Sequence, residues 1–455
     1  MPVADRVFVP AHLGALTDQL PAELIDEVLV QTLRQQRRVR LLPARLMVLF
    51  VLAMTLFPDR GYGRIWAALC ASVRQLLRGI PSTAALRQAR NRLGATPLRE
   101  LFDRLRGPVA PAVMPGAWWR GLRVVAWDGS TLALAEQTQI RSAFGGPTTQ
   151  HAAGGRPQMR IALLVECGTR AIIDAVFGSY RSGEPELAAR MLPSLRGGML
   201  LLADRNFVGL DLWRQAAATG AHLLWRMPSY LTWRPLRRLS DGSWLATRPG
   251  QRARRGHPAT TDTLVRVIEA TITIQRADGT CRTEPYVIMT TLLDSQRHPA
   301  RDLIELYHQR WEIEICLLGL KAIHKGTTRT LRSKTVEGVH QEFYALMITH
   351  HLLRQLICHA ALDTALDPDQ ISFTTTLHAI QASILNHRGV RDDNAIPDWQ
   401  DLLAELTDST TTAVRRSRVS PRPSPRTRTR PDFVHSQKVT YTITIDTTLT
   451  DDQAA

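Results

Sequence analysis

The chain has 455 residues, enough for about three domains with sizeable cores. Its composition, 44% hydrophobic and 22% charged, excludes a disordered or fibrous chain. The formal net charge of +16 favours a polyanionic partner, with nucleic acid ahead of an anionic membrane surface.

Neither a membrane nor an oxidising compartment is indicated. The most apolar run, residues 46–57, is shorter than the roughly 20 residues that cross a bilayer. The first residues lack the basic and apolar regions of a signal peptide. The five cysteines form no Cys-x-x-Cys pair, so we expect neither a disulfide framework nor a structural zinc site. A cytoplasmic protein is the expectation.

The beginning of the chain is predicted to be helical. Apolar periodicity and Gly or Pro boundaries predict helices over 20–33, 41–57, 83–93 and 98–106. Ser82 is the expected N-cap of the third of these.

Arginines are concentrated in this helical region. They gather at 34–40 and at Arg87, Arg90 and Arg92. Short helices rich in arginine are typical of a DNA-binding module, so these arginines are candidate DNA contacts. The alternative is a solvated, arginine-rich helical surface.

Strand signals begin near residue 120 and divide the rest of the chain. Strands are predicted over 123–129, 160–166, 171–178, 199–207, 221–227, 263–274, 286–293 and, loosely, 440–449. The order of strands and helices predicts a mixed α/β layer architecture. We expect a helical N-terminal domain over 1–115, a first core part over 116–229 and a β-rich insertion over 230–298. A second core part over 299–365, a helical segment over 366–407 and a basic low-complexity tail over 408–455 should follow. The tail should add only sequence-independent affinity for DNA.

Two carboxylates follow apolar strands in the same local setting. Asp128 stands in VVAWDGS and Asp204 in LLLADRNF. Ligands and metals usually lie at the carboxyl ends of strands in α/β sheets. The alternative is that each aspartate only forms the turn that follows its strand.

A third motif lies in YHQRWEIEICLLGLK. Its residues Tyr307, Arg310, Glu314 and Lys321 would share one face of a helix. A glutamate among basic and hydroxyl groups suits a metal site that meets phosphate. The alternative is an ordinary Arg–Glu pair on a solvated helix. Lys321 argues mildly against it, because this chain otherwise prefers arginine and a lysine suggests the need for a compact ammonium. His308 is expected on the helix surface.

The series Tyr-x2-Arg-x3-Glu-x6-Lys resembles the YREK signature of bacterial insertion-sequence DDE transposases of the IS-four group. The stretches WDGS, ADRNF and LRSKTVEGVHQEFYAL also resemble that group, as does the helical N-terminal region. The resemblance covers roughly residues 10–365.

This resemblance implies a ribonuclease-H-like, retroviral-integrase-like mixed sheet with a β-rich insertion. Asp128, Asp204 and Glu314 would be the catalytic, metal-binding triad. Hard oxygen ligands select Mg²⁺ or Mn²⁺, and two such ions can serve an in-line displacement at phosphorus. The activity implied is end cleavage and 3′-end joining by a homodimer on double-stranded DNA, both transposon ends and target, near the bacterial nucleoid. An inactivated copy that only binds DNA, or a related nuclease, is the alternative.

By the same resemblance, Arg310 and Lys321 would hold phosphates and Tyr307 would hydrogen-bond one. Group members stack a flipped base on a tryptophan of the insertion, and here Tyr286 stands at the matching strand. The alternative is that Tyr286 packs in the core, with Trp233 or Trp244 as the wedge.

Overall fold

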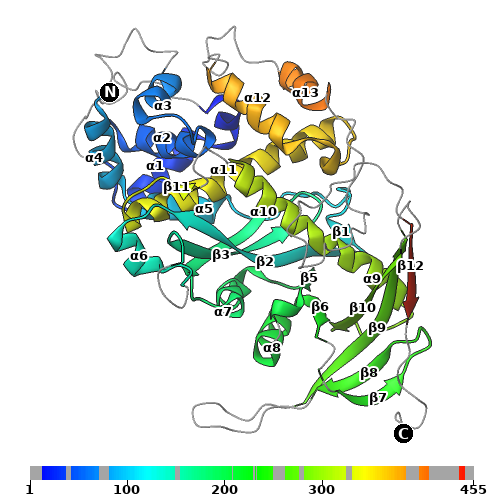
Figure 1. Cartoon of the computed structure of the whole chain (residues 1–455). Coiled ribbons are helices and arrows are strands. Elements are labelled where there is room, and N and C mark those ends of the chain that lie inside the picture. The colour runs from blue at the N-terminus through cyan, green and yellow to red at the C-terminus, as the bar shows by residue number, and fades with distance from the viewer. Residues whose placement is uncertain are drawn as a thin grey trace. The chain divides into compact units, whose positions relative to one another are not determined.

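The computed structural model falls into two compact units (Figure 1). Unit 1 comprises Met1–Ala117, Gly129–Gly183 and Ile313–Val414, and unit 2 comprises Trp118–Asp128, Glu184–Glu312 and Arg415–Ala455. The structure describes residues 13–36, 42–70, 81–148, 154–207, 209–228, 231, 233–248, 262–275, 281–323, 330–385, 399–408 and 440–445. Arg37, Arg38, Arg40 and the arginines of 252–255 and 415–430 lie outside these residues.

Helices dominate unit 1. They are α1 (Ala22–Gln31), α2 (Ala44–Leu56), α3 (Tyr62–Leu69), α4 (Thr83–Leu93), α5 (Thr96–Leu105), α6 (Thr138–Phe144), α10 (Trp311–Ile323, shared with unit 2), α11 (Val336–Asp363), α12 (Phe373–Leu385) and α13 (Trp399–Asp408). The predicted N-cap is confirmed, because the Ser82 side chain accepts a hydrogen bond from the Ala85 amide. Every residue of α2 except Arg45 is buried, as its apolar sequence requires. The long α11 packs against α2, α5 and α12 and is the centre of this unit (Figure 1).

Unit 1 also contains β-strands, and two of them form an antiparallel hairpin. The strands β3 (Gln158–Glu166) and β4 (Ile172–Ser179) are antiparallel and confirm the predicted hairpin. Next to β3 lies β2 (Leu122–Leu134), and the short β11 (Thr330–Leu331) pairs in parallel with its end. β2 contributes its first half to unit 2.

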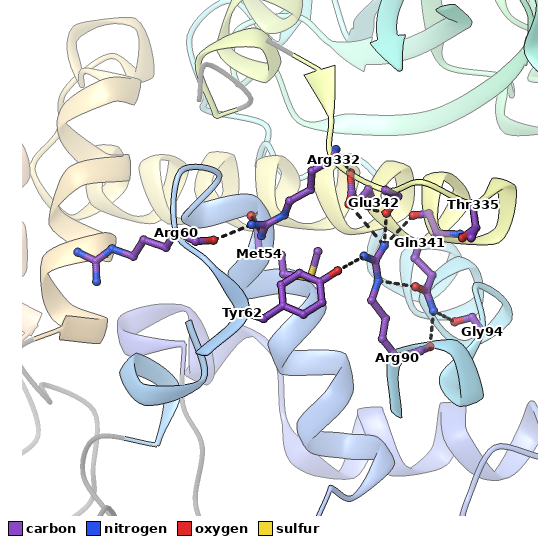
Figure 2. Close-up of polar contacts among 11 residues, drawn as sticks. Met54, Arg60, Tyr62, Arg90, Gly94, Arg332, Thr335, Gln341 and Glu342 are labelled. Atoms are coloured by element: carbon purple, nitrogen blue, oxygen red, sulfur yellow. Dashed lines mark hydrogen bonds and ion pairs between the residues drawn. The ribbon is translucent and has the colours of Figure 1, made fainter. Parts of the chain in front are cut away.

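A buried arginine joins helices that are distant in sequence. Arg90 on α4 is only 4% exposed. Its guanidinium donates to the hydroxyl of Tyr62 at 2.7 Å and to the side-chain oxygen of Gln341 at 2.7 Å (Figure 2). It also donates to the carbonyl of Gly338 at 2.8 Å and to the Ser333 hydroxyl at 2.6 Å. These bonds satisfy a charge that would otherwise be costly to bury.

Arg90 is therefore not a DNA contact, and that prediction was wrong. The side chain faces the protein interior, where its donors are used by partners on α3 and around the start of α11. By contrast, Arg87 and Arg92 on the same helix are exposed and stay candidates. The N-terminal helices and α11 belong to the same compact unit. The domain boundaries drawn from the sequence stay a prediction.

We expect Arg90→Met to lower the free energy of unfolding by about 3–5 kcal/mol, because it leaves buried acceptors without their donor. Urea denaturation followed by circular dichroism measures this change. The matched control is Arg87→Met on the exposed side of α4, which should change the free energy by less than about 0.5 kcal/mol. Equal effects of the two substitutions would contradict the structural role of Arg90.

Acid should destabilise the core around α11. His350 and His351 are buried there, and burial lowers the pKa of His351 to about 4 and the pKa of His350 well below its usual range. The unfolded chain binds protons at these imidazoles below about pH 6.5, whereas the folded chain does not. The free energy of unfolding should therefore fall as the pH drops from 6.5 towards 4. Urea midpoints across this range test it, and His351→Gln should reduce the slope; an unchanged slope would contradict it.

Unit 2 is built on a sheet with the strand order β2-β5-β6-β10-β9-β8-β7. Its strands besides β2 are β1 (Trp118–Trp119), β5 (Met199–Ala203), β6 (His222–Met227), β7 (Arg234–Arg238), β8 (Trp244–Arg248), β9 (Thr263–Gln275), β10 (Cys281–Thr290) and β12 (Thr440–Ile445). The strands β2, β5 and β6 are parallel, and β7–β10 are antiparallel. Helices α7 (Glu184–Ala189), α8 (Leu210–Ala218) and α9 (Ala300–Tyr307) also belong to this unit.

The predicted fold is confirmed. The order β4-β3-β2-β5-β6, with the hairpin first and the parallel strands after it, is that of a ribonuclease-H-like mixed sheet. The β-rich insertion forms β7–β10, although β10 starts at Cys281, earlier than predicted, because its first residues pair with β9. The loose C-terminal strand is β12, which also pairs with β9. Among the described helices, none has both the length and the apolarity that crossing a membrane would require.

Candidate active site

Asp128 and Asp204 stand at equivalent positions of two neighbouring strands. In the parallel pair β2–β5, Ala126 is the register partner of Leu202. Asp128 and Asp204 each follow two residues later on their own chain segments. Adjacent strands are roughly 4.8 Å apart, so this register brings the two carboxylates to the same edge of the sheet. The register thus brings together the segments that carry two of the three predicted acidic residues.

Asp204 is held by the turn that follows β5. Its side chain is buried, and its Oδ1 accepts a hydrogen bond from the Asn206 amide at 2.7 Å. The next residues form a 3-10 turn, η5 (Arg205–Phe207), whose Phe207 ring packs 5.4 Å from that of Trp127. Asp204 therefore does form the turn that follows its strand, and the hydrogen bond from Asn206 fixes the orientation of its side chain at the strand end.

Arg310 forms an ion pair with Asp128. Its Nη1 lies 3.6 Å from Oδ2 of Asp128, and the residue is 5% exposed. The guanidinium also lies over the Trp311 ring, 5.4 Å from its centre. A positive charge at this place offsets the repulsion between two neighbouring carboxylates.

Tyr307 lies beside Asp204, with its side chain turned inward. Its hydroxyl donates a hydrogen bond to the carbonyl oxygen of Ala203 at 3.0 Å, and the residue is 4% exposed. Burial is the main cause that raises the pKa of this phenol above its usual range, so the hydroxyl stays protonated and remains a donor. The predicted phosphate contact by Tyr307 is not what this structure shows.

Tyr286 packs against the same aromatic group. Its ring lies 6.1 Å from that of Tyr307 and 6.0 Å from that of His308, and the Arg226 guanidinium covers it at 3.9 Å. The residue is buried in this structure, as the packing alternative expects, and the stacking of a flipped base on it stays a prediction. Trp244 is also buried, whereas Trp233 is half-buried.

Two residues of this group escaped the sequence analysis. His308 is buried rather than on the helix surface, and burial lowers its pKa to about 4, which keeps the imidazole neutral near pH 7. Arg226 was not considered, although a single arginine in the apolar strand His222–Met227 is a signal that could have found it. Its guanidinium also donates to the Pro285 carbonyl at 3.1 Å and so links β6 to β10.

The predicted single helix around the signature is divided by a tighter turn. A 3-10 turn, η6 (His308–Arg310), separates α9 from α10 (Trp311–Ile323). A 3-10 turn has three residues per turn, so Tyr307 and Arg310 stay aligned with each other, while the winding differs from the 3.6 residues per turn on which the single face was predicted. Glu314 and Lys321 follow on the part of α10 that belongs to unit 1, where Glu314 is half-buried and Lys321 is exposed.

The predicted metal triad draws on residues of both units of the chain. Within the part of the chain that the structure describes, no group of three or more His, Cys, Asp or Glu side chains is arranged to hold a metal ion. The donor chemistry nevertheless fits Mg²⁺ or Mn²⁺, because Asp128 and Asp204 offer hard carboxylate oxygens on neighbouring segments of the sheet. The triad itself stays a prediction.

Comparison with known proteins relates the N-terminal region of the chain, and the region that follows it, to transposases. Residues 10–103 match the family described as insertion element 4 transposase N-terminal, and residues 119–352 match the family described as transposase DDE domain. The second match covers just over half of the chain.

Two relatives come from Escherichia coli (strain K12). The transposase InsG for insertion sequence element IS4 is 26% identical over 416 residues, which are 90% of this chain and 91% of InsG. The putative transposase InsZ is 25% identical over 229 residues, 50% of this chain and 75% of InsZ. A solved structure, the piggyBac transposase synaptic complex with hairpin DNA, aligns with a TM-score of 0.38 and 10% identity, over 91% of this chain and 87% of that one.

Proposed function

Because the chain belongs to the family of transposases with a DDE domain, we propose that it binds the terminal inverted repeats of an insertion sequence, cleaves them and joins the 3′ ends to target DNA. The observation that supports this most directly is the register of two parallel strands, which places Asp128 within β2 next to the end of β5, where Asp204 follows. Two carboxylates at that edge are the start of a site for phosphoryl transfer.

Asp128, Asp204 and Glu314 are the proposed ligands of two Mg²⁺ or Mn²⁺ ions. When bound, such ions would activate a water or 3′-hydroxyl and stabilise the leaving 3′-oxygen. The chain's own residues prepare the site for this chemistry. Arg310 balances the charge of Asp128, and the turn after β5 orients Asp204. Glu314, half-buried on α10, would supply the third carboxylate.

DNA contacts are proposed for exposed basic residues. Lys321 on α10, and Arg87 and Arg92 on α4, present their charges to solvent. With a net charge of +16, such residues can attract the DNA backbone over a wide area. Because two transposon ends must be processed together, we propose that a homodimer acts on the DNA, in the bacterial cytoplasm.

Replacing any proposed metal ligand should abolish cleavage but not binding. We expect Asp128→Ala, Asp204→Ala and Glu314→Ala each to slow end nicking by about 10³-fold or more, since each removes several kcal/mol of transition-state stabilisation. Nicking of a labelled transposon end in Mg²⁺ and gel-shift binding of the same DNA measure the two properties.

The control removes a carboxylate elsewhere in unit 2. Asp211→Ala on α8, whose side chain is 56% exposed, should nick like the wild type. A triad variant that nicks within a few-fold of the wild type would exclude that residue from the site. A wild-type chain that binds ends specifically but never cleaves them would favour a protein that only binds DNA.

Arg87→Ala and Arg92→Ala should each weaken binding of end DNA and reduce the salt dependence of the binding constant by about one counterion. Gln88→Ala is the matched control, because Gln88 is exposed on the same helix but carries no charge. Binding constants measured at several salt concentrations test this. Salt slopes equal to that of the control would exclude α4 from the DNA interface.

A further inference from the structure

We propose that Tyr307 is a positioning residue for Asp204: its hydroxyl fixes the end of β5, directly before the residue that carries the carboxylate. This inference rests on the proposed function, since it gives Asp204 a metal-binding role. It concerns only residues of unit 2.

The first observation is a direct bond to the backbone before Asp204. The Tyr307 hydroxyl donates to the Ala203 carbonyl at 3.0 Å. Ala203 is the last residue of β5, and Asp204 follows it immediately. On the other side, the Asn206 amide donates to Oδ1 of Asp204 at 2.7 Å. The carboxylate therefore lies between two anchors, one on each side along the chain.

The second observation is that the Tyr307 ring cannot easily turn away. It packs edge-on against Tyr286 at an interplanar angle of 77°. Tyr286 is in turn covered by the Arg226 guanidinium, which donates to the carbonyl of Pro285. Arg226 is on β6 and Tyr286 is on β10, so the pairing of these two strands holds both residues in place.

The third observation is burial. With 4% of its surface exposed, Tyr307 could reach a DNA phosphate only if the stack opened and the bond to Ala203 broke. A buried acceptor left without its donor is unfavourable, which disfavours this alternative. Groups that hold a metal ligand from behind typically change metal affinity 10- to 100-fold when they are removed.

Tyr307→Phe removes only the hydroxyl, so it tests the proposal without emptying the core. Tyr180→Phe is the matched control, a hydroxyl deletion on a half-buried tyrosine in unit 1. We expect faster amide exchange over residues 204–207 in Tyr307→Phe and wild-type exchange in the control, measured by mass spectrometry on the full chain without metal. Unchanged exchange at 204–207 would overturn the proposal.

The second measurement is Mn²⁺ binding to the full-length protein by isothermal titration. Tyr307→Phe should weaken the affinity about 10- to 100-fold, and Asp204→Asn should weaken it at least as much. In the Asp204→Asn background, the tyrosine substitution should have no further effect, because its influence passes through the carboxylate. If the free protein binds Mn²⁺ too weakly, the half-saturating Mn²⁺ concentration for nicking replaces the titration.

The outcomes separate this proposal from the proposed function. If Asp204→Asn weakens Mn²⁺ binding and Tyr307→Phe does not, only the role of Tyr307 fails. If Asp204→Asn binds Mn²⁺ like the wild type, the proposed metal site fails instead. If Tyr307→Phe weakens binding of end DNA and leaves Mn²⁺ affinity unchanged, Tyr307 is a phosphate contact and the proposal is wrong.

Discussion

The parallel pairing of β2 with β5 is the constraint on which the site depends. It brings the segments that carry Asp128 and Asp204 next to each other, and like charges on neighbouring segments repel each other in the absence of a cation. The surrounding residues offset this repulsion in different ways. Arg310 brings a positive charge to Asp128, whereas Asp204 receives a backbone hydrogen bond from the turn that follows it. Through Arg310, the helical segment after the insertion thus places a positive charge beside Asp128.

Much of this arrangement can be predicted from the sequence, because it follows from local patterns. The apolar runs before each aspartate predict buried strands, and the Gly and Pro boundaries predict the N-terminal helices. The failures come from tertiary contacts. A spacing of three and four residues predicts one continuous α-helix, but a 3-10 turn at His308–Arg310 interrupts it. Nothing in the sequence around Tyr286 predicts that the Arg226 guanidinium lies over its ring.

Arg90 shows where a closer reading of the pattern would have helped. The buried residues of α4 are Leu86, Ala89, Arg90 and Leu93, the spacing of an apolar stripe. Arg87 and Arg92 lie outside that stripe. The position of Arg90 could therefore have been predicted as buried. Its partners could not, because Gln341 is 251 residues away in the sequence and no local rule connects them.

That separation has a consequence for the order in which the protein is made. At a synthesis rate of roughly 5–20 residues per second, the α4 arginine waits at least about ten seconds for the acceptors that lie 251 residues later. A truncated product ending before Ser333 retains Tyr62 as a partner but lacks the acceptors around the start of α11. The N-terminal helices of such a fragment would have to bury a guanidinium without those acceptors. The N-terminal helices of a growing chain therefore complete this set of hydrogen bonds only after the start of α11 has been made.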